Sequence, residues 1–251
     1  MMRPLYILPV ALHSRLNAVS FHYNAPPMRV DWLTQNPYMR SREAAILEAL
    51  DVDGARVLEV GCGEGNNLIV RGIRGAFGID ISRESLRTAA KRTDGKFAQS
   101  DAARLPFRDG AFDRVFARDI LHHVEDPRGS VAEMVRVCAP GGKVCILDDN
   151  GRNAILRLFS AIDPTERNIA KQTPRGLAAL FEGLPVGPVA LSVREPTLVY
   201  RAILHHKFGL PSLGKSKLFA RTMDRVISAL ERTSNPETWA KISIVATRNP
   251  A

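Results

Sequence analysis

Three glycines at alternate positions, Gly61, Gly63 and Gly65, stand between a short apolar run and a segment with helix-like spacing. Glycine reaches backbone angles that side chains forbid, and it lets a ligand approach the main chain closely. An apolar strand, a glycine turn and a helix N-terminus together make a nucleotide-type site at the carboxyl end of a sheet. Glu59 adds an acid two residues before the first glycine. These residue types predict a binding site for a nucleotide-like ligand.

Further polar residues follow other short apolar runs. Asp80 lies about 20 residues beyond the glycines, where a carboxylate can accept both hydroxyls of a bound ribose. Its alternative role is to cap the next helix, although Ser82 already suits that position. His122 and His123 follow a later run, and imidazole titrates near neutral pH, so either can act as a general base. The alternative for each histidine is packing beneath the ligand with a hydrogen bond to the backbone.

Alternating strands and helices must position these residues. Short apolar runs predict strands over residues 56–60, 75–82, 96–100, 114–117 and 144–147. Apolar faces at helical spacing predict helices over residues 41–50, 83–92, 127–138, 173–181 and 217–232, with Ser41 as the cap of the first. Strands that alternate with helices predict an α/β protein with a mostly parallel sheet.

The order of the motifs then distinguishes between nucleotide-binding families. The glycines run G-x-G-x-G, whereas a dinucleotide fingerprint runs G-x-G-x-x-G. This pattern resembles motif I of the class I S-adenosylmethionine-dependent methyltransferases. Residues 105–113 resemble the "LPF…FD" stretch of that group, residues 118–124 resemble the "lhHv" signature of its small-molecule type 11 family, and residues 139–143 resemble its "pGG" turn. The resemblance covers residues 41–149 well and residues 173–247 loosely.

The resemblance implies a Rossmann-like class I methyltransferase fold. Its sheet would be mostly parallel and seven-stranded, with helices on both faces and a final antiparallel hairpin. Residues 186–193 and 240–246 would then be the sixth and seventh strands. We expect an N-terminal arm over residues 1–40 and a methyltransferase domain over residues 41–251. Within the domain, the inserted segments 151–172 and 195–238 would form a helical cap on the acceptor side.

The resemblance also implies a cofactor, S-adenosyl-L-methionine, with S-adenosyl-L-homocysteine as its product. Asp80 would hold the ribose, Asp101 would lie beside the adenine amino group with Ala102 offering a backbone N–H, and Glu59 would order the loop and reach the ammonium group through water. An alternative for Asp101 is a turn residue. The implied cofactor-binding residues are Glu59, Gly61, Cys62, Gly63, Gly65, Asp80, Ile81, Asp101, Ala102 and Arg118. The implied catalytic residues are His123, His122 and Asp119, and no metal is required.

Two further segments carry open alternatives. Asp148, Asp149 and Asn150 end the fifth expected strand, where a carboxylate can hold an acceptor hydroxyl or only cap. Residues 217–232 form an amphipathic pattern with Leu218, Met223, Val226, Ile227 and Leu230 on one face and Lys217, Arg221, Arg225 and Arg232 on another. This helix either contacts a membrane surface or an anionic acceptor, or is a packed helix with a solvated basic face.

Composition limits the class of protein. A hydrophobic content of 45% with 24% charged residues is ordinary for a globular chain of 251 residues. The three cysteines, Cys62, Cys138 and Cys145, form no C-x-x-C pair and indicate neither a disulfide framework nor a zinc site, so a reducing cytoplasm is the expected location. The apolar run at residues 5–12 is a poor signal peptide, and no stretch approaches the ~18 apolar residues of a membrane span.

The charge distribution and the motifs lead to one preferred function and its rivals. The net charge is +9, and residues 200–251 carry +6 of it, from nine Lys and Arg against three Asp and Glu. Such an excess suits an anionic substrate, a membrane surface or nucleic acid. We expect methyl transfer to a small or amphiphilic organic acceptor, with O- or C-methylation favoured over N-methylation. The rivals are an RNA methyltransferase, a catalytically silent cofactor-binding scaffold and, weakest, an NAD dehydrogenase.

Overall fold

The computed structural model describes residues 33–48, 50–205 and 209–250 of the chain. Most of the predicted N-terminal arm therefore lies outside the described residues. Within the described part, none of the helices is both long enough and apolar enough to cross a bilayer.

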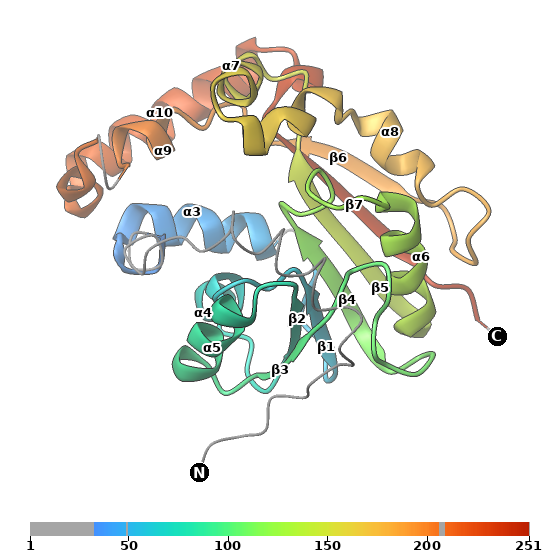
Figure 1. The fold of residues 1–251 in the computed structure, drawn as a ribbon. Coiled ribbons are helices and arrows are strands. Elements are labelled where there is room, and N and C mark those ends of the chain that lie inside the picture. The colour runs from blue at the N-terminus through green and yellow to red at the C-terminus, as the bar shows by residue number, and fades with distance from the viewer. Residues whose placement is uncertain (1–32, 49, 206–208, 251) are drawn as a thin grey trace.

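A seven-stranded sheet forms the centre of the molecule (Figure 1). Its strand order is β3-β2-β1-β4-β5-β7-β6; the first five strands pair in parallel, and β7 runs antiparallel to both β5 and β6. The strands are β1 Val57–Val60, β2 Phe77–Asp80, β3 Lys96–Gln99, β4 Phe112–Arg118, β5 Cys138–Asp149, β6 Ala190–Arg194 and β7 Lys241–Thr247. All four residues of β1 are buried, as expected for a parallel strand covered on both faces. The predicted mostly parallel sheet with a final antiparallel hairpin is confirmed.

Helices cover both faces of this sheet (Figure 1). Val131 and Met134 of α6 and Leu177 of α8 pack in the core of one face. Leu47 of α3 and Leu86 of α5 pack in the core of the other. The helices are α3 Pro37–Glu48, α4 Asn66–Arg71, α5 Arg83–Arg92, α6 Pro127–Val137, α7 Ala154–Ile162, α8 Pro174–Ala179, α9 Val199–Ile203 and α10 Lys217–Thr233, with 3-10 turns η2 Pro164–Lys171, η3 Pro211–Lys215 and η4 Pro236–Thr238.

Side-chain caps explain where several helices begin. Ser82 accepts a hydrogen bond from the backbone N–H of Ser85, as predicted for α5. Asp126 and Thr173 cap α6 and α8 in the same way, each followed by a proline. The predicted bounds of α5 are confirmed, and those of α6 and α8 differ by one or two residues.

The first predicted helix is placed wrongly. α3 begins at Pro37, four residues before the predicted start, and Ser41 lies inside it, where its hydroxyl donates to the Tyr38 carbonyl. Asn36 accepts a hydrogen bond from the Met39 N–H at 3.2 Å, so an asparagine followed by proline provides the earlier start. The predicted boundary at residue 40 therefore falls within α3.

Of the seven strands, β5 and β6 differ most from their predicted bounds. β5 continues back through the glycine turn at residues 139–143, because a register shift between Phe112 and Arg114 of β4 accommodates the extra residues as a bulge. Gly141 adopts a φ of +74° there, a backbone angle that favours glycine. β6 begins at Ala190 rather than at residue 186, with only an isolated bridge between Val186 and Arg248 before it.

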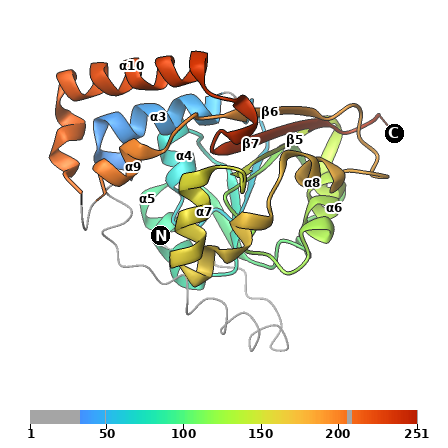
Figure 2. The ribbon, with the colours of Figure 1, turned by 90° about the horizontal axis from the view of Figure 1, so that it is seen from above.

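The two inserted segments form a helical layer together with α3. In Figure 1 the arrowheads of β4 and β5 point toward this layer, and Figure 2 shows α10 running alongside α3. A separate hydrophobic cluster joins these elements; it contains Tyr38, Met39, Leu156, Ile169, Leu198, Tyr200, Leu204, Met223, Ile227 and Ala240. The layer thus has a core of its own beyond the carboxyl ends of the parallel strands.

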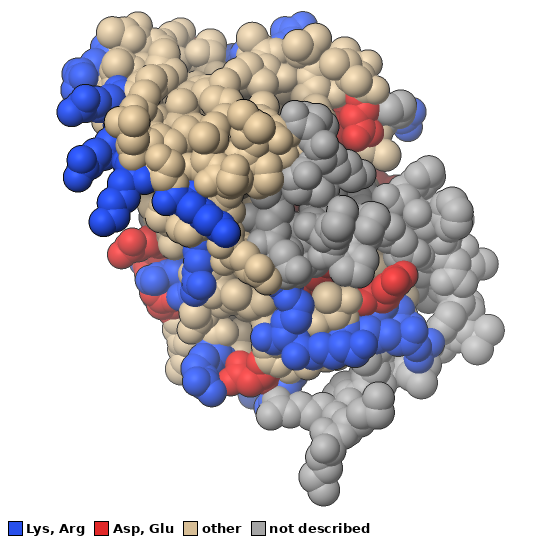
Figure 3. Space-filling model, turned by 90° about the vertical axis from the view of Figure 1, so that its left-hand side faces the viewer, with Lys and Arg blue, Asp and Glu red and all other residues tan. Residues whose placement is uncertain are grey.

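The predicted apolar face of α10 is partly wrong. Met223 and Ile227 are buried, but Leu218 is 75% exposed and Val226 is 38% exposed. Tyr38 of α3 contacts α10: its hydroxyl donates to Asp224 at 2.9 Å, and its ring meets the Phe219 ring edge-on. The basic side chains of α10 are exposed. Figure 3 shows Lys and Arg at several places on the face that it presents, with fewer Asp and Glu.

Candidate functional site

The glycine loop joins β1 to α4 at the carboxyl end of the sheet. Gly61, Gly63 and Gly65 have φ values of +73°, +50° and +77°, the left-handed region that favours glycine. The N–H groups of Gly61 and Cys62 donate to the Ile79 carbonyl at 2.8 and 2.9 Å, which fixes the loop to the end of β2. A Cβ atom at Gly61 would lie 2.4 Å from Cγ2 of Ile120, so the loop also requires glycine for its contact with the segment after β4.

Cys62 and Ile81 were also predicted to bind the cofactor. The Cys62 side chain is buried and turned under the loop, where a Cβ at Gly78 would lie 2.7 Å from its sulfur. Burial raises the pKa of the Cys62 thiol. Ile81 follows β2, and its carbonyl accepts a hydrogen bond from the Gln99 side chain at 2.9 Å.

Glu59 is a buried acid, and one of its carboxyl oxygens has no hydrogen-bond partner. Its Oε1 accepts a hydrogen bond from Nδ2 of Asn67 at 2.6 Å, and its buried Oε2 has no partner. Burial raises the pKa of the Glu59 carboxyl to about 8. A buried polar atom without a partner is costly, so this oxygen is suited to accept a donor from a ligand.

The predicted ribose and adenine residues lie at the next two strand ends. Asp80 accepts hydrogen bonds from the N–H groups of Gly63 at 2.8 Å and Ser82 at 2.7 Å, and burial raises its pKa despite these bonds. Asp101 accepts a hydrogen bond from the Ala103 N–H at 2.9 Å, immediately after β3, with Ala102 buried between them. The structure therefore brings the predicted glycines and both acids to one edge, and their contacts with a cofactor stay predictions.

Arg118 ends β4 in a buried group of charges. Its guanidinium pairs with Glu43 of α3 and donates to Oδ1 of Asn67 at 3.1 Å. Arg201 of α9 also pairs with Glu43, at 2.7 Å. Burial opposes ionisation of Glu43, but the two arginines lower its pKa to about 2. Arg118 therefore links the strand end to α3 and α9, and its predicted contact with the cofactor stays a prediction.

Asp119, a predicted catalytic residue, is partly exposed and pairs with a buried lysine. Nζ of Lys241, in β7, lies 2.6 Å from Asp119 Oδ1 and 2.5 Å from Asp149 Oδ1. Although burial would raise it, the Lys241 ammonium and the Arg118 guanidinium hold the pKa of Asp119 below its usual range. Asp119 thus remains ionised and paired, which makes it a weak candidate for a general base.

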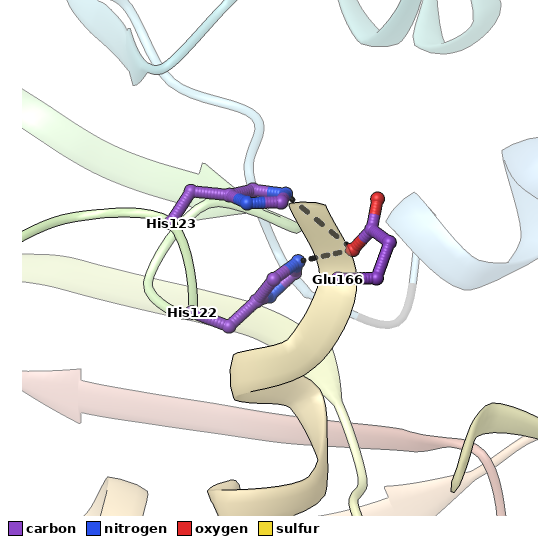
Figure 4. Close-up of side chains that lie close together, drawn as sticks. All are labelled: His122, His123 and Glu166. Atoms are coloured by element: carbon purple, nitrogen blue, oxygen red, sulfur yellow. Dashed lines mark hydrogen bonds and ion pairs between the residues drawn. The ribbon is translucent and has the colours of Figure 1, made fainter. Parts of the chain in front are cut away.

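The predicted catalytic histidines lie against Glu166 of η2 (Figure 4). His122 Nδ1 lies 2.5 Å from Asp148 Oδ1, and His122 Nε2 lies 3.2 Å from Glu166 Oε2. Burial alone would lower the pKa of His122, but these carboxylates raise it to about 10. His123 Nε2 lies 3.6 Å from the same Glu166 oxygen, and burial and the adjacent His122 lower its pKa. Of the two, His123 is the more accessible, with 17% of its side chain exposed against 1% for His122.

The end of β5 supports these groups rather than facing an open site. Asp148 Oδ2 accepts the Leu121 N–H and its Oδ1 the Asp149 N–H, both at 2.8 Å. The Asn150 amide donates to the carbonyls of Glu237 and Trp239. Both Asp148 and Asn150 are fully buried. These contacts favour the capping alternative for this strand end over contact with an acceptor.

Sequence reasoning missed four residues of this region: Glu43, Glu166, Arg201 and Lys241. Lys241 had a signal, because a lysine inside the apolar run of the last strand needs a buried partner. The other three lie in helices or turns far along the chain from their partners, and no spacing rule links them.

Comparison with known proteins gives the relatives of this chain. Residues 58–146 match a methyltransferase-domain family of type 11. The chain is 38% identical over 122 residues to a phosphatidylethanolamine N-methyltransferase of Cereibacter sphaeroides (45% of this chain, 59% of the relative). It is 31% identical over 149 residues to a ubiquinone biosynthesis O-methyltransferase of Psychrobacter arcticus (54% and 57%). The chain spans about half the length of the curated relatives it matches.

Solved structures share the fold at low sequence identity. Phosphoethanolamine N-methyltransferase 2 of Haemonchus contortus, bound to S-adenosylhomocysteine, aligns with a TM-score of 0.65 and 16% identity over 94% of this chain and 61% of its own. A SAM-dependent methyltransferase from Archaeoglobus fulgidus aligns with a TM-score of 0.57 and 20% identity over 83% and 94%. The sheet order, the glycine loop, the family match and these alignments agree: the described chain has the Rossmann-like methyltransferase fold, and its residues 58–146 match the type 11 methyltransferase family.

Proposed function

We propose that this chain transfers the methyl group of S-adenosylmethionine to an oxygen or carbon atom of a small or amphiphilic organic acceptor. The observation that carries the proposal is the unpartnered Oε2 of Glu59, buried beside a loop in which three glycines have positive φ. This oxygen can accept a hydrogen bond from the ammonium group of the methionine end, directly or through one water, and that cation would favour the ionised form of the acid.

The residues at this edge fit the cofactor. The glycine loop offers open backbone, and a Cβ built at Gly63 has no neighbour within 4 Å, so that position has room for a ligand. Asp80 would bind the ribose, and Asp101 with Ala102 would bind the adenine edge. The cofactor supplies an activated methyl group, so the chain's own task is to align an acceptor with it and to receive a proton where one is released.

His123 is the residue we propose to receive that proton. It follows β4, it is partly exposed, and its Nε2 lies 3.6 Å from the Glu166 carboxylate, which can orient the ring. Both ring nitrogens of His122 lie within hydrogen-bonding distance of a carboxylate, and Asp119 is paired with Lys241. A proton acceptor on this side favours O- or C-methylation, although the relatives include enzymes named for both N- and O-methylation.

The helical layer would select the acceptor. Ile155, Leu158, Phe159 and Ile162 share one face of α7 at helical spacing, and all four are exposed. An exposed apolar face in the layer beyond the strand ends suits an acceptor with an apolar part. The matched relatives include enzymes named for lipid and quinone substrates, which is consistent with such an acceptor.

The test is transfer of isotope-labelled methyl groups from S-adenosylmethionine to separate pools of hydroquinones, other enolisable carbon acids, amines, phospholipids and RNA. We expect label in the hydroquinone or carbon-acid pool, and loss of that label in His123→Ala with cofactor affinity retained. Label only in amines would contradict O- or C-methylation. Label only in RNA, falling steeply with added salt, would establish the RNA alternative instead.

A further inference from the structure

We propose that His122, His123 and Glu166 form a binding site for a divalent transition-metal ion of the Zn²⁺ type. Their three ligand atoms lie within 4.8 Å of one another, and this is the group of the described residues whose types and placement suit an ion. The sequence pointed to no metal site, because Glu166 lies more than 40 residues from the histidines along the chain.

Two of the three separations between ligand atoms are close to those around a small ion. Glu166 Oε2 lies 3.2 Å from His122 Nε2 and 3.6 Å from His123 Nε2. Ligands of a tetrahedral ion bound at 2.0–2.1 Å are about 3.3 Å apart. Figure 4 shows the two rings one above the other, both directed toward the same oxygen of the Glu166 carboxylate. An ion could therefore bind with small side-chain rotations.

The chemistry of the donors selects the class of ion. Two imidazoles and one carboxylate are a common set for Zn²⁺ and related transition ions, whereas Mg²⁺ prefers oxygen ligands alone. Three protein ligands leave at least one coordination position open. His123 and Glu166 are both partly exposed, at 17% and 18%, so an ion and a further ligand can enter from that side.

Asp148 orients one ligand independently of the cluster. It lies 2.5 Å from Nδ1 of His122, so it would keep a proton at Nδ1 when an ion replaces the proton at Nε2. Asp148 is itself held by the N–H groups of Leu121 and Asp149. A buried carboxylate behind a metal-binding imidazole is the usual arrangement of such sites.

The segment that carries Glu166 is also anchored to the histidines. Nδ2 of Asn168 donates to the His122 carbonyl at 3.1 Å, and the Gly151 N–H donates to the Gln172 carbonyl at 2.9 Å. These bonds fix η2 against the ends of β4 and β5. The three ligands therefore stand on anchored elements, which reduces the conformational cost of binding an ion.

The ion and a proton compete for the same lone pair of His123. In the metal-bound chain, an acceptor hydroxyl placed at the open coordination position would lose its proton more readily because of the ion's charge. This consequence rests on the proposed function, whereas binding of the ion does not.

The experiment is a calorimetric titration of the tag-free, chelator-treated chain with Zn²⁺, together with absorption spectra of the chain titrated with Co²⁺. We expect one equivalent to bind, with a cobalt spectrum of nitrogen and oxygen ligation. Glu166→Gln and His123→Ala should weaken Zn²⁺ binding at least ten-fold, and Asp148→Asn, which leaves all ligands in place, by roughly 10–100-fold. The double variant His205→Ala/His206→Ala removes the other adjacent histidine pair and should bind as the unaltered chain does.

Several results would overturn the proposal. These are the absence of one-equivalent binding, equal affinity in Glu166→Gln and the unaltered chain, loss of binding in the 205–206 control, or a cobalt charge-transfer band from thiolate. Circular dichroism melting of each variant shows whether it folds. If one ligand variant fails to fold, the other ligand variant and the cobalt spectrum still decide. Cofactor titration of the same samples separates a failure of this site from a failure of the proposed function.

Discussion

Two neighbouring stretches of the same sheet edge are built by different means. At the ends of β1 and β2 the glycine loop is shaped by backbone hydrogen bonds to Ile79 and Asp80. At the ends of β4, β5 and β7 the structure is held by buried ion pairs between side chains, centred on Glu43, Lys241 and His122. The first stretch leaves one carboxylate oxygen, on Glu59, without a partner, whereas the second pairs its charges with one another.

The difference indicates that one stretch is suited to binding a ligand and the other to holding helices against the sheet. A site that binds the same cofactor in every reaction can be built from backbone groups and from an acid with one oxygen left unpaired for the ligand. The helices of the inserted segments must be held at the strand ends. Buried ion pairs hold α3, α9 and η2 against the strands. The predictions below test this contrast from the largest expected effect to the smallest.

Lys241→Met should cause the largest loss of stability. It leaves the buried carboxylate of Asp149 and the partly exposed carboxylate of Asp119 without their shared cation. Breaking a buried ion pair on one side costs about 3–5 kcal/mol in the free energy of unfolding. Urea unfolding measures this loss. The control is Lys143→Met, which removes an exposed pair with Asp51 and should cost under about 1 kcal/mol. Equal losses in the two variants would contradict the role of Lys241.

Gly61→Ala should cost about 2–4 kcal/mol, from left-handed backbone strain and from a clash with Ile120. Gly72→Ala is the matched control: its φ is +75°, close to the +73° of Gly61, but a Cβ there has no neighbour within 4 Å. It should cost about 1–2 kcal/mol. Comparison of the two unfolding curves isolates the contact with Ile120. A Gly72 variant as destabilised as the Gly61 variant would show that the contact is unimportant.

Glu59→Gln should change how stability depends on pH. The folded chain raises the pKa of Glu59 from 4.5 to about 8, so between these values the folded state holds a proton that the unfolded chain has released. The stability that this proton contributes is therefore present at low pH and is lost as pH rises toward 8. Urea unfolding at pH 5.5 and pH 8 should show a decrease in the unaltered chain that exceeds the decrease in the variant by about 1 kcal/mol or more. Identical pH dependence would mean that Glu59 is ionised throughout.

The double variant Arg221→Ala/Arg225→Ala should have the smallest effect. Both arginines are exposed on α10. We expect the free energy of unfolding to change by no more than about 0.5 kcal/mol. A loss above 2 kcal/mol would show that the basic face is part of the fold. Co-sedimentation with anionic vesicles, which should be equal for both proteins if this face is only solvated, tests the membrane alternative.

The positions of the predicted cofactor residues could be located from the sequence because the determinants of those strand ends are local. Glu59, the glycines and Asp80 lie at the ends of strands that the apolar pattern reveals, and the helix after Asp80 begins at its predicted cap. The contacts at the ends of β4, β5 and β7 could not be predicted in the same way. Glu43 meets Arg118 across 75 residues and Lys241 meets Asp119 across 122, contacts that only the folded chain creates.

The errors at helix starts and faces have the same origin. Ser41 had the right chemistry for a cap, but Asn36 and Pro37 provided an earlier start. Leu218 of α10 fitted an apolar face by its spacing, yet the contact with α3 leaves it exposed. In both cases the local pattern allowed more than one solution, and tertiary packing selected between them.

The most direct test of the account is calorimetric titration of the purified chain with S-adenosylmethionine, S-adenosylhomocysteine and NAD in parallel, repeated with Asp80→Ala. The account predicts micromolar binding of the two sulfur compounds, no binding of NAD, and a large loss of affinity in the variant with folding retained. Absence of binding by either sulfur compound would contradict the proposed cofactor site, and the scaffold alternative would then be the leading hypothesis.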